Sequence, residues 1–179
     1  MIERLKLPFT VSARGAEVVI RRATREDLQP IVQLLSDDPI SAGRGDVASA
    51  EDADAYAEAL RRIIDDPSNE LVVVLNDSGA VVGTLQLTVI PGMARRGSTR
   101  LLVEAVRVKS AERSSGIGSA LMRWVMEQAA IDLGAPLVQL TSDAARTDAH
   151  RFYTRLGFAD SHVGFKYYVD RSHPANHQR

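Results

Sequence analysis

The sequence contains no cysteine, and this absence removes several kinds of protein from consideration. Without thiols there is no disulfide scaffold, no cysteine-ligated zinc or iron–sulfur site and no thiolate nucleophile. An excess of one charge is lacking too, because 22 Lys and Arg residues face 23 Asp and Glu residues and leave a net charge of −1. No global field draws such a chain to nucleic acid or to an anionic membrane, so we expect neither as a partner.

Long hydrophobic runs are also missing. The first residues carry charges at positions 3, 4 and 6, and no apolar stretch there has the length of a signal-peptide core. No segment reaches the roughly 18 uncharged apolar residues of a membrane span. We therefore expect a cytoplasmic protein. Its 179 residues, 45% of them hydrophobic, suit one globular domain with one core.

The hydrophobic pattern predicts strands and helices in alternation. Strands are expected over 17–22, 71–75, 80–90, 100–108, 137–141 and 161–169, and helices over 25–36, 51–65, 117–133 and 148–156. Residues 1–16 are interpreted as an N-terminal extension, 17–169 as the domain and 170–179 as a polar tail. This order predicts an α/β fold with a mixed sheet of six to seven strands and about four flanking helices.

A glycine-containing turn, Lys109-Ser-Ala-Glu-Arg-Ser-Ser-Gly-Ile-Gly-Ser119, joins strand 100–108 to helix 117–133. Such a turn presents backbone N–H groups toward one point, and its glycines let phosphate oxygens approach the main chain. It predicts an anion cradle, with a merely tight connection as the alternative. A P-loop is excluded because no Lys follows Gly118, and a dinucleotide fingerprint because position 121 is leucine.

Two motifs together resemble the GNAT superfamily of N-acetyltransferases. Residues 104–108 read Glu-x-Val-x-Val and residues 113–119 read Arg-x-x-Gly-x-Gly-Ser, which is similar to the acetyl-CoA-binding motif of that superfamily. Residues 150–158 read His-Arg-Phe-Tyr-Thr-Arg-Leu-Gly-Phe, which resembles its carboxyl-terminal helix motif. The resemblance covers about residues 17–169 and implies the GNAT fold, whose sheet is mixed but mostly antiparallel.

The resemblance implies acetyl-CoA as co-substrate and no metal. Backbone groups of residues 106–108 would pair with the pantetheine arm as an added strand would, and amides of residues 113–119 would hold the pyrophosphate. The implied cofactor-binding residues are Val106, Arg107, Val108, Arg113, Ser114, Ser115, Gly116, Ile117, Gly118, Ser119, His150 and Tyr153. Many family members carry an Arg-Gly pair where this chain has Ser114-Ser115, which removes one cation near the phosphates.

Acyl transfer from a thioester to an amine needs a base, donors for the oxyanion and an acid for the leaving thiolate. Glu104 is the predicted base, because a carboxylate in an apolar strand is costly unless it is paired or used. Strand alternation places it on the face of Val106 and Val108. The alternative is an ion pair with Arg95, Arg96 or Arg100. The resemblance implies action directly or through a water, and an oxyanion donor in the backbone N–H near Val108.

Tyr153 is the predicted general acid, because its hydroxyl can donate to a thiolate. A core tyrosine is the alternative, and the family motif favours the acid. His150 lies one helical turn earlier and either faces the same cleft or is exposed. Acidic residues around the first two helices either attract a cationic amine or cap the helices. They are Asp37, Asp38, Asp46, Glu51, Asp52 and Asp54.

We therefore expect an acetyl-CoA-dependent N-acetyltransferase in which a primary amine attacks the thioester directly in a ternary complex. The acceptor is a small molecule or a peptide, and a ping-pong route through cysteine is unavailable. The alternatives are a non-catalytic acyl-CoA-binding regulatory domain and a protein or peptide N-acetyltransferase. Homodimers are common in the family, so a homodimer is one form to expect.

Overall fold

The computed structural model describes residues 2–43 and 45–169, which belong to two units. The amino-terminal unit ends at Leu140 and contains the whole sheet, while the carboxyl-terminal unit begins at Thr141. The strands are β1 (Phe9–Ala13), β2 (Ala16–Arg22), β3 (Asn69–Leu75), β4 (Val81–Ile90), β5 (Arg100–Val108) and β6 (Leu137–Leu140). The polar tail predicted over 170–179 lies outside the described residues.

The helices largely follow the prediction. They are α1 (Leu28–Ser36), α2 (Pro39–Ala42), α3 (Ala53–Asp65), α4 (Ala94–Gly97), α5 (Ile117–Trp124), α6 (Ala130–Asp132) and α7 (Thr147–Arg155). A π-helical turn over Val125–Ala129 joins α5 to α6, so the helix predicted over 117–133 is continuous but not regular. The short α2 and α4 lie outside the four predicted helices.

The six strands form one sheet in the order β1-β2-β3-β4-β5-β6. Only β5 and β6 are parallel, and every other neighbouring pair is antiparallel. The predicted mixed, mostly antiparallel sheet is therefore confirmed, with six strands in the described residues.

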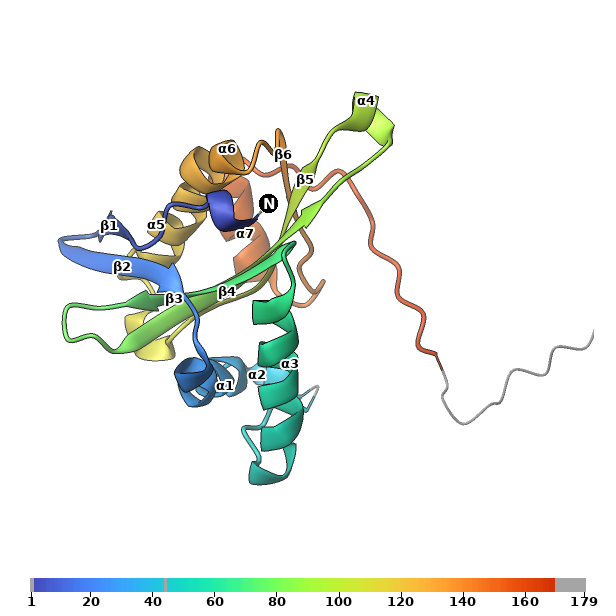
Figure 1. Ribbon diagram of the computed structural model, residues 1–179. Helices are drawn as coiled ribbons and strands as arrows, with labels where there is room; N and C mark the ends of the chain where they lie inside the picture. Colours follow the sequence, from blue (N-terminus) through green and yellow to red (C-terminus); the bar gives the residue numbers. More distant parts are fainter. Residues whose placement is uncertain (1, 44, 170–179) are drawn as a thin grey trace, which may run out of the picture. The chain divides into compact units, whose positions relative to one another are not determined.

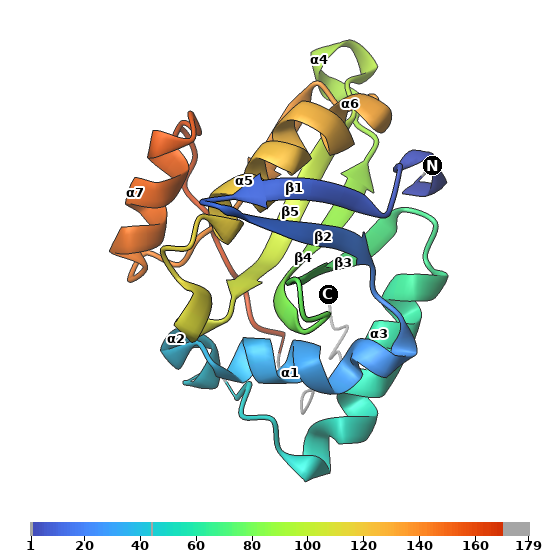
Figure 2. The same ribbon diagram turned by 90° about the vertical axis from the view of Figure 1, so that its left-hand side faces the viewer.

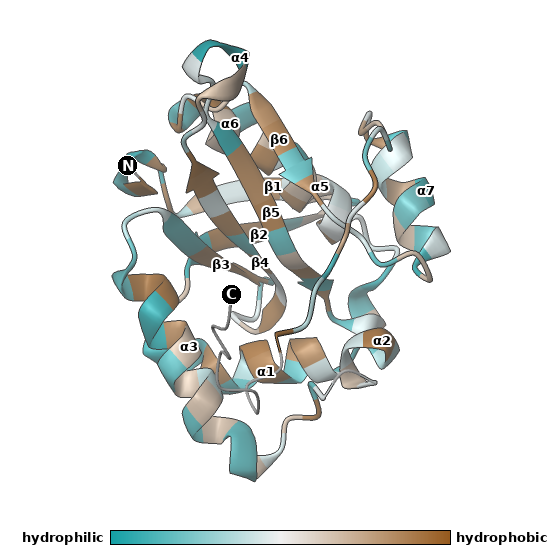
Figure 3. Ribbon diagram, turned by 90° about the vertical axis from the view of Figure 1, so that its right-hand side faces the viewer, coloured by the Kyte–Doolittle hydropathy of each residue, from teal (hydrophilic) through white to brown (hydrophobic). Residues whose placement is uncertain are grey.

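Helices cover both faces of the sheet (Figure 1). On one, the α1 face, Leu71 and Val73 of β3 pack in a cluster with Ile31 of α1 and Leu60 of α3. On the other, the α5 face, α5 lies over β1 and β5 (Figure 2). In Figure 3, brown segments of β5 are interrupted by teal ones, and its hydrophobic run Leu101–Val103 is longer than strict alternation would give.

Strand β1 lies inside the segment that was interpreted as an N-terminal extension. It pairs with β2 from Phe9↔Ile20 to Ala13↔Ala16, which leaves a two-residue turn. Both turn residues have positive φ, +22° at Arg14 and +94° at Gly15, as a type I′ hairpin requires. The first sixteen residues therefore contribute a strand to the sheet.

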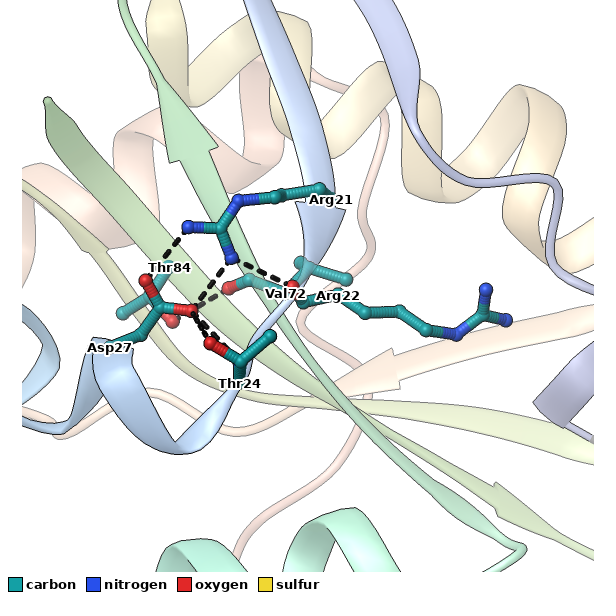
Figure 4. Close-up of polar contacts among 6 residues, drawn as sticks. All are labelled: Arg21, Arg22, Thr24, Asp27, Val72 and Thr84. Carbon is teal, nitrogen blue, oxygen red and sulfur yellow. Dashed lines mark hydrogen bonds and ion pairs between the residues drawn. The ribbon is translucent and has the colours of Figure 1, made fainter. Parts of the chain in front are cut away.

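An ion pair fixes the chain where β2 leads toward α1 (Figure 4). The guanidinium of Arg21 donates two hydrogen bonds to the Asp27 carboxylate, at 2.7 and 2.8 Å. The same carboxylate accepts the backbone N–H of Thr24 at 2.8 Å. The hydrogen bonds from Arg21 hold the pKa of Asp27 below its usual range.

A bulge interrupts the pairing of β4 with β5. Thr84 faces Arg107 whereas Gln86 faces Glu104, so β5 has one more residue than β4 in this interval. The two residues of β5 in this interval are Ala105 and Val106, and Ala105 has a left-handed backbone with φ of +50°. A bulge of this kind reverses the alternation of side chains beyond it.

The carboxyl-terminal unit contains α7 and then residues 156–169. The strand predicted over 161–169 is absent in this described part, which has no regular secondary structure. The alternating apolar side chains that suggested the strand are exposed, Val163 by 80% and Phe165 by 93%. Alternation indicated a strand, but a strand also needs a hydrogen-bonding partner, which the pattern does not specify.

Candidate active site

The glycine loop leaves β5 and leads into the first turn of α5, as predicted. Ser114 and Gly116 both have left-handed backbone, with φ of +71° and +91°. Gly116 is the N-cap of α5, and Ile117, Gly118 and Ser119 form its first turn, where backbone N–H groups lack helical partners. This arrangement has the geometry that the predicted anion cradle requires, at the positive end of a helix dipole.

Gly116 and Gly118 have different structural requirements. Any other residue at position 116 would have to adopt a left-handed backbone, and its Cβ would lie 2.9 Å from Cγ of Arg14. Gly118 lies within α5, where any residue can adopt the backbone conformation. Gly116 is therefore needed for the shape of the loop, whereas for Gly118 we predict that a side chain would act by occupying the cradle.

Three hydrogen bonds with two distant segments hold the loop. The carboxylate of Asp37, just after α1, accepts the backbone N–H of Ser110 at 2.6 Å, and this hydrogen bond lowers the pKa of Asp37. The guanidinium of Arg113 donates to the backbone carbonyl of Asp37 at 3.3 Å. From the other side, Nη1 of Arg14 donates to the carbonyl of Ser114 at 3.0 Å.

The second half of β5 has a free edge. Its pairing with β6 covers Arg100 to Val103 and stops there, where β6 ends at Leu140. Within residues 2–43 and 45–169, no strand pairs with the other edge of residues 104–108. Unpaired backbone groups of this kind accept an added extended ligand, which fits the amides of a pantetheine arm.

Glu104 lies on the α1 face, because its partner Gln86 is also the partner of Leu71. The prediction that it shares a face with Val108 is wrong: the bulge at Ala105 turns Arg107, not Val108, to that face. The alternative ion pair with a neighbouring arginine is not formed. Glu104 is exposed, and its carboxylate has no hydrogen bond or ion pair with any residue that the structure describes.

Arg107 connects this face to α2. Its Nη2 donates to Oγ of Ser41 at 2.5 Å, and its Nη1 donates to the carbonyl of Val106 at 2.9 Å. The carboxylate of Asp38 caps α2 by accepting the N–H of Ser41 at 2.9 Å. The capping explanation for the acidic residues is thus confirmed at Asp38, whereas Asp37 holds the loop and Asp46 accepts the hydroxyl of Tyr56.

A row of polar side chains adjoins Glu104 on the α1 face, and the sequence patterns gave no sign of it. Asn69 faces Thr88 across β3 and β4, and Gln86 is the direct partner of Glu104. Oδ1 of Asn69 accepts from Nε2 of Gln86 at 2.9 Å and from Oγ1 of Thr88 at 2.6 Å. Amide groups half-buried beside a carboxylate can recognise polar groups of a ligand.

In the carboxyl-terminal unit, the aromatic motif forms the end of α7. The N–H of Phe158 donates to the carbonyl of Tyr153 and that of Gly157 to the carbonyl of Thr154, which is a Schellman motif with left-handed Gly157. The rings of Tyr153 and Phe158 pack edge to face at 5.8 Å. The ring of Tyr153 therefore has a structural role at the end of α7.

His150 also belongs to α7. It is exposed, and its Nε2 lies 2.8 Å from the carbonyl of Asp143 in the preceding turn. Its predicted cofactor contact remains a prediction. In the amino-terminal unit, Arg95 and Arg96 are exposed and left-handed, with φ of +53° and +61°.

Neither a membrane-spanning helix nor a cluster of metal ligands is present among the described residues. No helix among them is long and apolar enough to cross a membrane. No group of three or more His, Cys, Asp or Glu side chains in the described parts could hold a metal ion.

A strand with a free edge that leads into a glycine loop is the arrangement that the sequence predicted for an acyl-CoA-using transferase. The chain matches the model of the Acetyltransferase (GNAT) family over residues 28–158. It is 30% identical over 154 residues to an aminoalkylphosphonate N-acetyltransferase of Salmonella typhimurium, covering 83% of this chain and 97% of that protein.

Solved structures also resemble this chain. A transcriptional regulator from Bacillus halodurans is 41% identical, with a TM-score of 0.79 over 85% of this chain and 99% of that one. Glucosamine-6-phosphate N-acetyltransferase from Arabidopsis thaliana is 17% identical, with a TM-score of 0.68 over 86% and 99%, and shows the shared fold. The chain belongs to the GNAT acetyltransferase family and is an N-acetyltransferase, an acyltransferase of class EC 2.3.1.

Proposed function

We propose that the chain moves the acetyl group of acetyl-CoA to the primary amine of a small acceptor, by direct attack in a ternary complex. One observation carries this proposal: the free edge of β5 begins beside the unpaired carboxylate of Glu104 and ends at the glycine loop. A base, a strand edge for the pantetheine arm and a cradle for the pyrophosphate then follow one another along a single strand.

The proposed roles balance the reaction. Glu104 accepts the proton of the acceptor amine, directly or through a water, as the amine nitrogen forms its bond to the acetyl carbon. A backbone N–H near Val108 donates to the oxyanion. The bond between carbon and sulfur then breaks, and the hydroxyl of Tyr153 gives its proton to the thiolate.

We further propose that the acceptor is an aminoalkylphosphonate or a similar short amine with an anionic group. The 30% identical relative is named for acceptors of this class, and the match extends over 97% of that protein. Arg107 supplies a positive charge on the α1 face that also carries Glu104. Gln86 and Asn69 add hydrogen-bonding groups beside the carboxylate.

An acetyl-CoA-binding regulatory domain is the second candidate. The 41% identical structure from Bacillus halodurans is described as a transcriptional regulator, which favours this alternative. Such a domain would bind acetyl-CoA and release no thiol.

The test is a panel of amines with acetyl-CoA, read with a thiol reagent. Because the chain has no cysteine, every thiol detected is free CoA. We expect release above hydrolysis with aminoalkylphosphonates, and weaker release with alkylamines of equal length that lack the phosphonate. Binding of acetyl-CoA without thiol release from any aminoalkylphosphonate, aminoglycoside or peptide would favour the regulatory domain, and absence of binding would overturn both candidates.

A further inference from the structure

The turn between β1 and β2 places an arginine directly on the loop that leads into α5. Nη1 of Arg14 lies 3.0 Å from the carbonyl oxygen of Ser114, although the two residues are 100 positions apart. The stem of Arg14 lies so close to Gly116 that a Cβ there would be 2.9 Å from Cγ. Figure 2 shows the tip of this hairpin beside the chain that enters α5.

The loop itself has little positive charge where phosphates would lie. Residues 114–119 read Ser-Ser-Gly-Ile-Gly-Ser and contain no Lys or Arg. The guanidinium of Arg113, at the start of the loop, donates to the carbonyl of Asp37. The cation closest to the middle of the loop by these contacts is therefore Arg14, from another element.

The guanidinium of Arg14 can donate further hydrogen bonds beyond the one to Ser114. It carries five N–H groups, and one of them serves Ser114. The side chain is exposed, and its other donors have no partner within residues 2–43 and 45–169. The paired strands and the tight turn fix the backbone of Arg14, so the guanidinium is held at the rim of the cradle.

We propose that Arg14 binds a phosphate of acetyl-CoA and supplies the cation that positions 114 and 115 lack. The planar guanidinium suits phosphate oxygens because it donates two parallel hydrogen bonds. This inference rests on the proposed function, since it takes acetyl-CoA as the ligand. The phosphate is either in the pyrophosphate or at the 3′ position of the ribose.

The test measures dissociation constants by calorimetry for the full chain and its variants Arg14→Ala, Arg14→Lys and Arg62→Ala. Arg62 is an exposed arginine of α3 and serves as the matched control. The ligands are acetyl-CoA, its analogue without the 3′-phosphate, and S-acetylpantetheine. For Arg14→Ala we expect acetyl-CoA to bind about 10- to 100-fold more weakly, with S-acetylpantetheine unchanged, Lys intermediate and the control like the wild type.

The two phosphates are distinguished by the analogue. A loss that persists without the 3′-phosphate assigns Arg14 to the pyrophosphate, and a loss that disappears assigns it to the 3′-phosphate. Unchanged binding in Arg14→Ala, or equal weakening for acetyl-CoA and S-acetylpantetheine, would overturn the proposal and leave Arg14 a structural role.

A further variant of Arg14 controls for misfolding. Arg14→Gly removes the side chain but suits the positive φ of the turn, so it should melt at or above the wild-type temperature and bind acetyl-CoA as weakly as Arg14→Ala. If the wild type does not bind acetyl-CoA, the proposed function fails. If the wild type binds acetyl-CoA, and Arg14→Ala and Arg14→Gly bind it as tightly as the wild type does, only the role of Arg14 fails.

Discussion

Gly116 and Gly118 should fail in opposite ways when they are replaced, although only one residue separates them. Gly116 has φ of +91°, a region that costs a residue with a Cβ about 1–2 kcal/mol. Its Cβ would also lie 2.9 Å from Cγ and 3.3 Å from the backbone N of Arg14. The flexible stem of Arg14 can move, whereas the backbone must shift slightly.

The reduced freedom of the unfolded chain offsets part of this cost, by about 0.4–1 kcal/mol. With the small cost of the contact with the Arg14 backbone added, we expect Gly116→Ala to lower the free energy of unfolding by about 0.5–2 kcal/mol, and the melting temperature by about 1–8 °C for a chain of this size. Gly118→Ala lies in a helix, where alanine is favoured by up to about 1 kcal/mol, so its melting temperature should hold or rise.

Stabilisation by acetyl-CoA should be sensitive to Gly118, the glycine whose replacement does not lower the stability of the free protein. At a hundredfold excess over its dissociation constant, acetyl-CoA should stabilise the wild type by about 2.7 kcal/mol. Gly118→Val should lose most of this shift, because its side chain occupies the cradle. Gly79→Ala is the matched control, since Gly79 has φ of +77° in the β3–β4 turn with nothing within 4 Å of an added Cβ. It should lose stability and keep the full shift.

Differential scanning fluorimetry with and without acetyl-CoA gives all of these values. A wild-type melting temperature for Gly116→Ala would refute the left-handed loop. An undiminished acetyl-CoA shift for Gly118→Val would mean that the ligand binds elsewhere.

Three further substitutions test the chemistry and the fold. Glu104→Gln should lower turnover about 10²–10⁴-fold, and this defect should shrink as the pH rises, because more of the amine then arrives deprotonated. A defect that stays constant with pH, in a range where chemistry limits the rate, would contradict the role of Glu104 as a base. Tyr153→Phe keeps the ring contact with Phe158, so acetyl-CoA affinity should survive while turnover falls. The defect should shrink with acyl donors whose leaving thiol is more acidic, and normal turnover would exclude Tyr153 as the acid. Asp27→Asn should cost about 1–2 kcal/mol near neutral pH. Because the hydrogen bonds from Arg21 lower the pKa of Asp27, this difference should begin to shrink in denaturant titrations as the pH falls below about 4, and it should vanish only once the pH is below that lowered pKa. A difference that stays constant with pH would exclude the ion pair.

Local patterns predicted most of the elements because each depended on its own residues. The 3.6-residue period gave α3, and β-branched runs gave β3 and β4. Strand β1 was missed, although Phe9, Val11 and Ala13 alternate before the turn at Arg14 and Gly15. The strand expected over 161–169 was predicted from the same kind of alternation, and it has no ladder in the structure.

Part of the candidate site was likewise predictable from the sequence, and part was not. Its glycine loop and Glu104 were visible because a motif is contiguous in sequence. Arg14 and Asp37 were not predicted to hold the loop, because their contacts span 100 and 73 positions. No spacing rule connects residues so far apart, and only the folded sheet brings them together.

The bulge at Ala105 determines which side chains share a face with Glu104, and a single substitution tests it. In a regular strand, replacing alanine by glycine costs about 0.5–1 kcal/mol. At φ of +50°, glycine instead relieves a strain of about 1–2 kcal/mol, which cancels or exceeds its entropic cost. Ala105→Gly should therefore leave the free energy of unfolding unchanged or raise it by up to about 1 kcal/mol. A loss near 1 kcal/mol in denaturant titration would mean a regular strand, in which Glu104 and Arg107 face opposite sides of the sheet and cannot serve one acceptor.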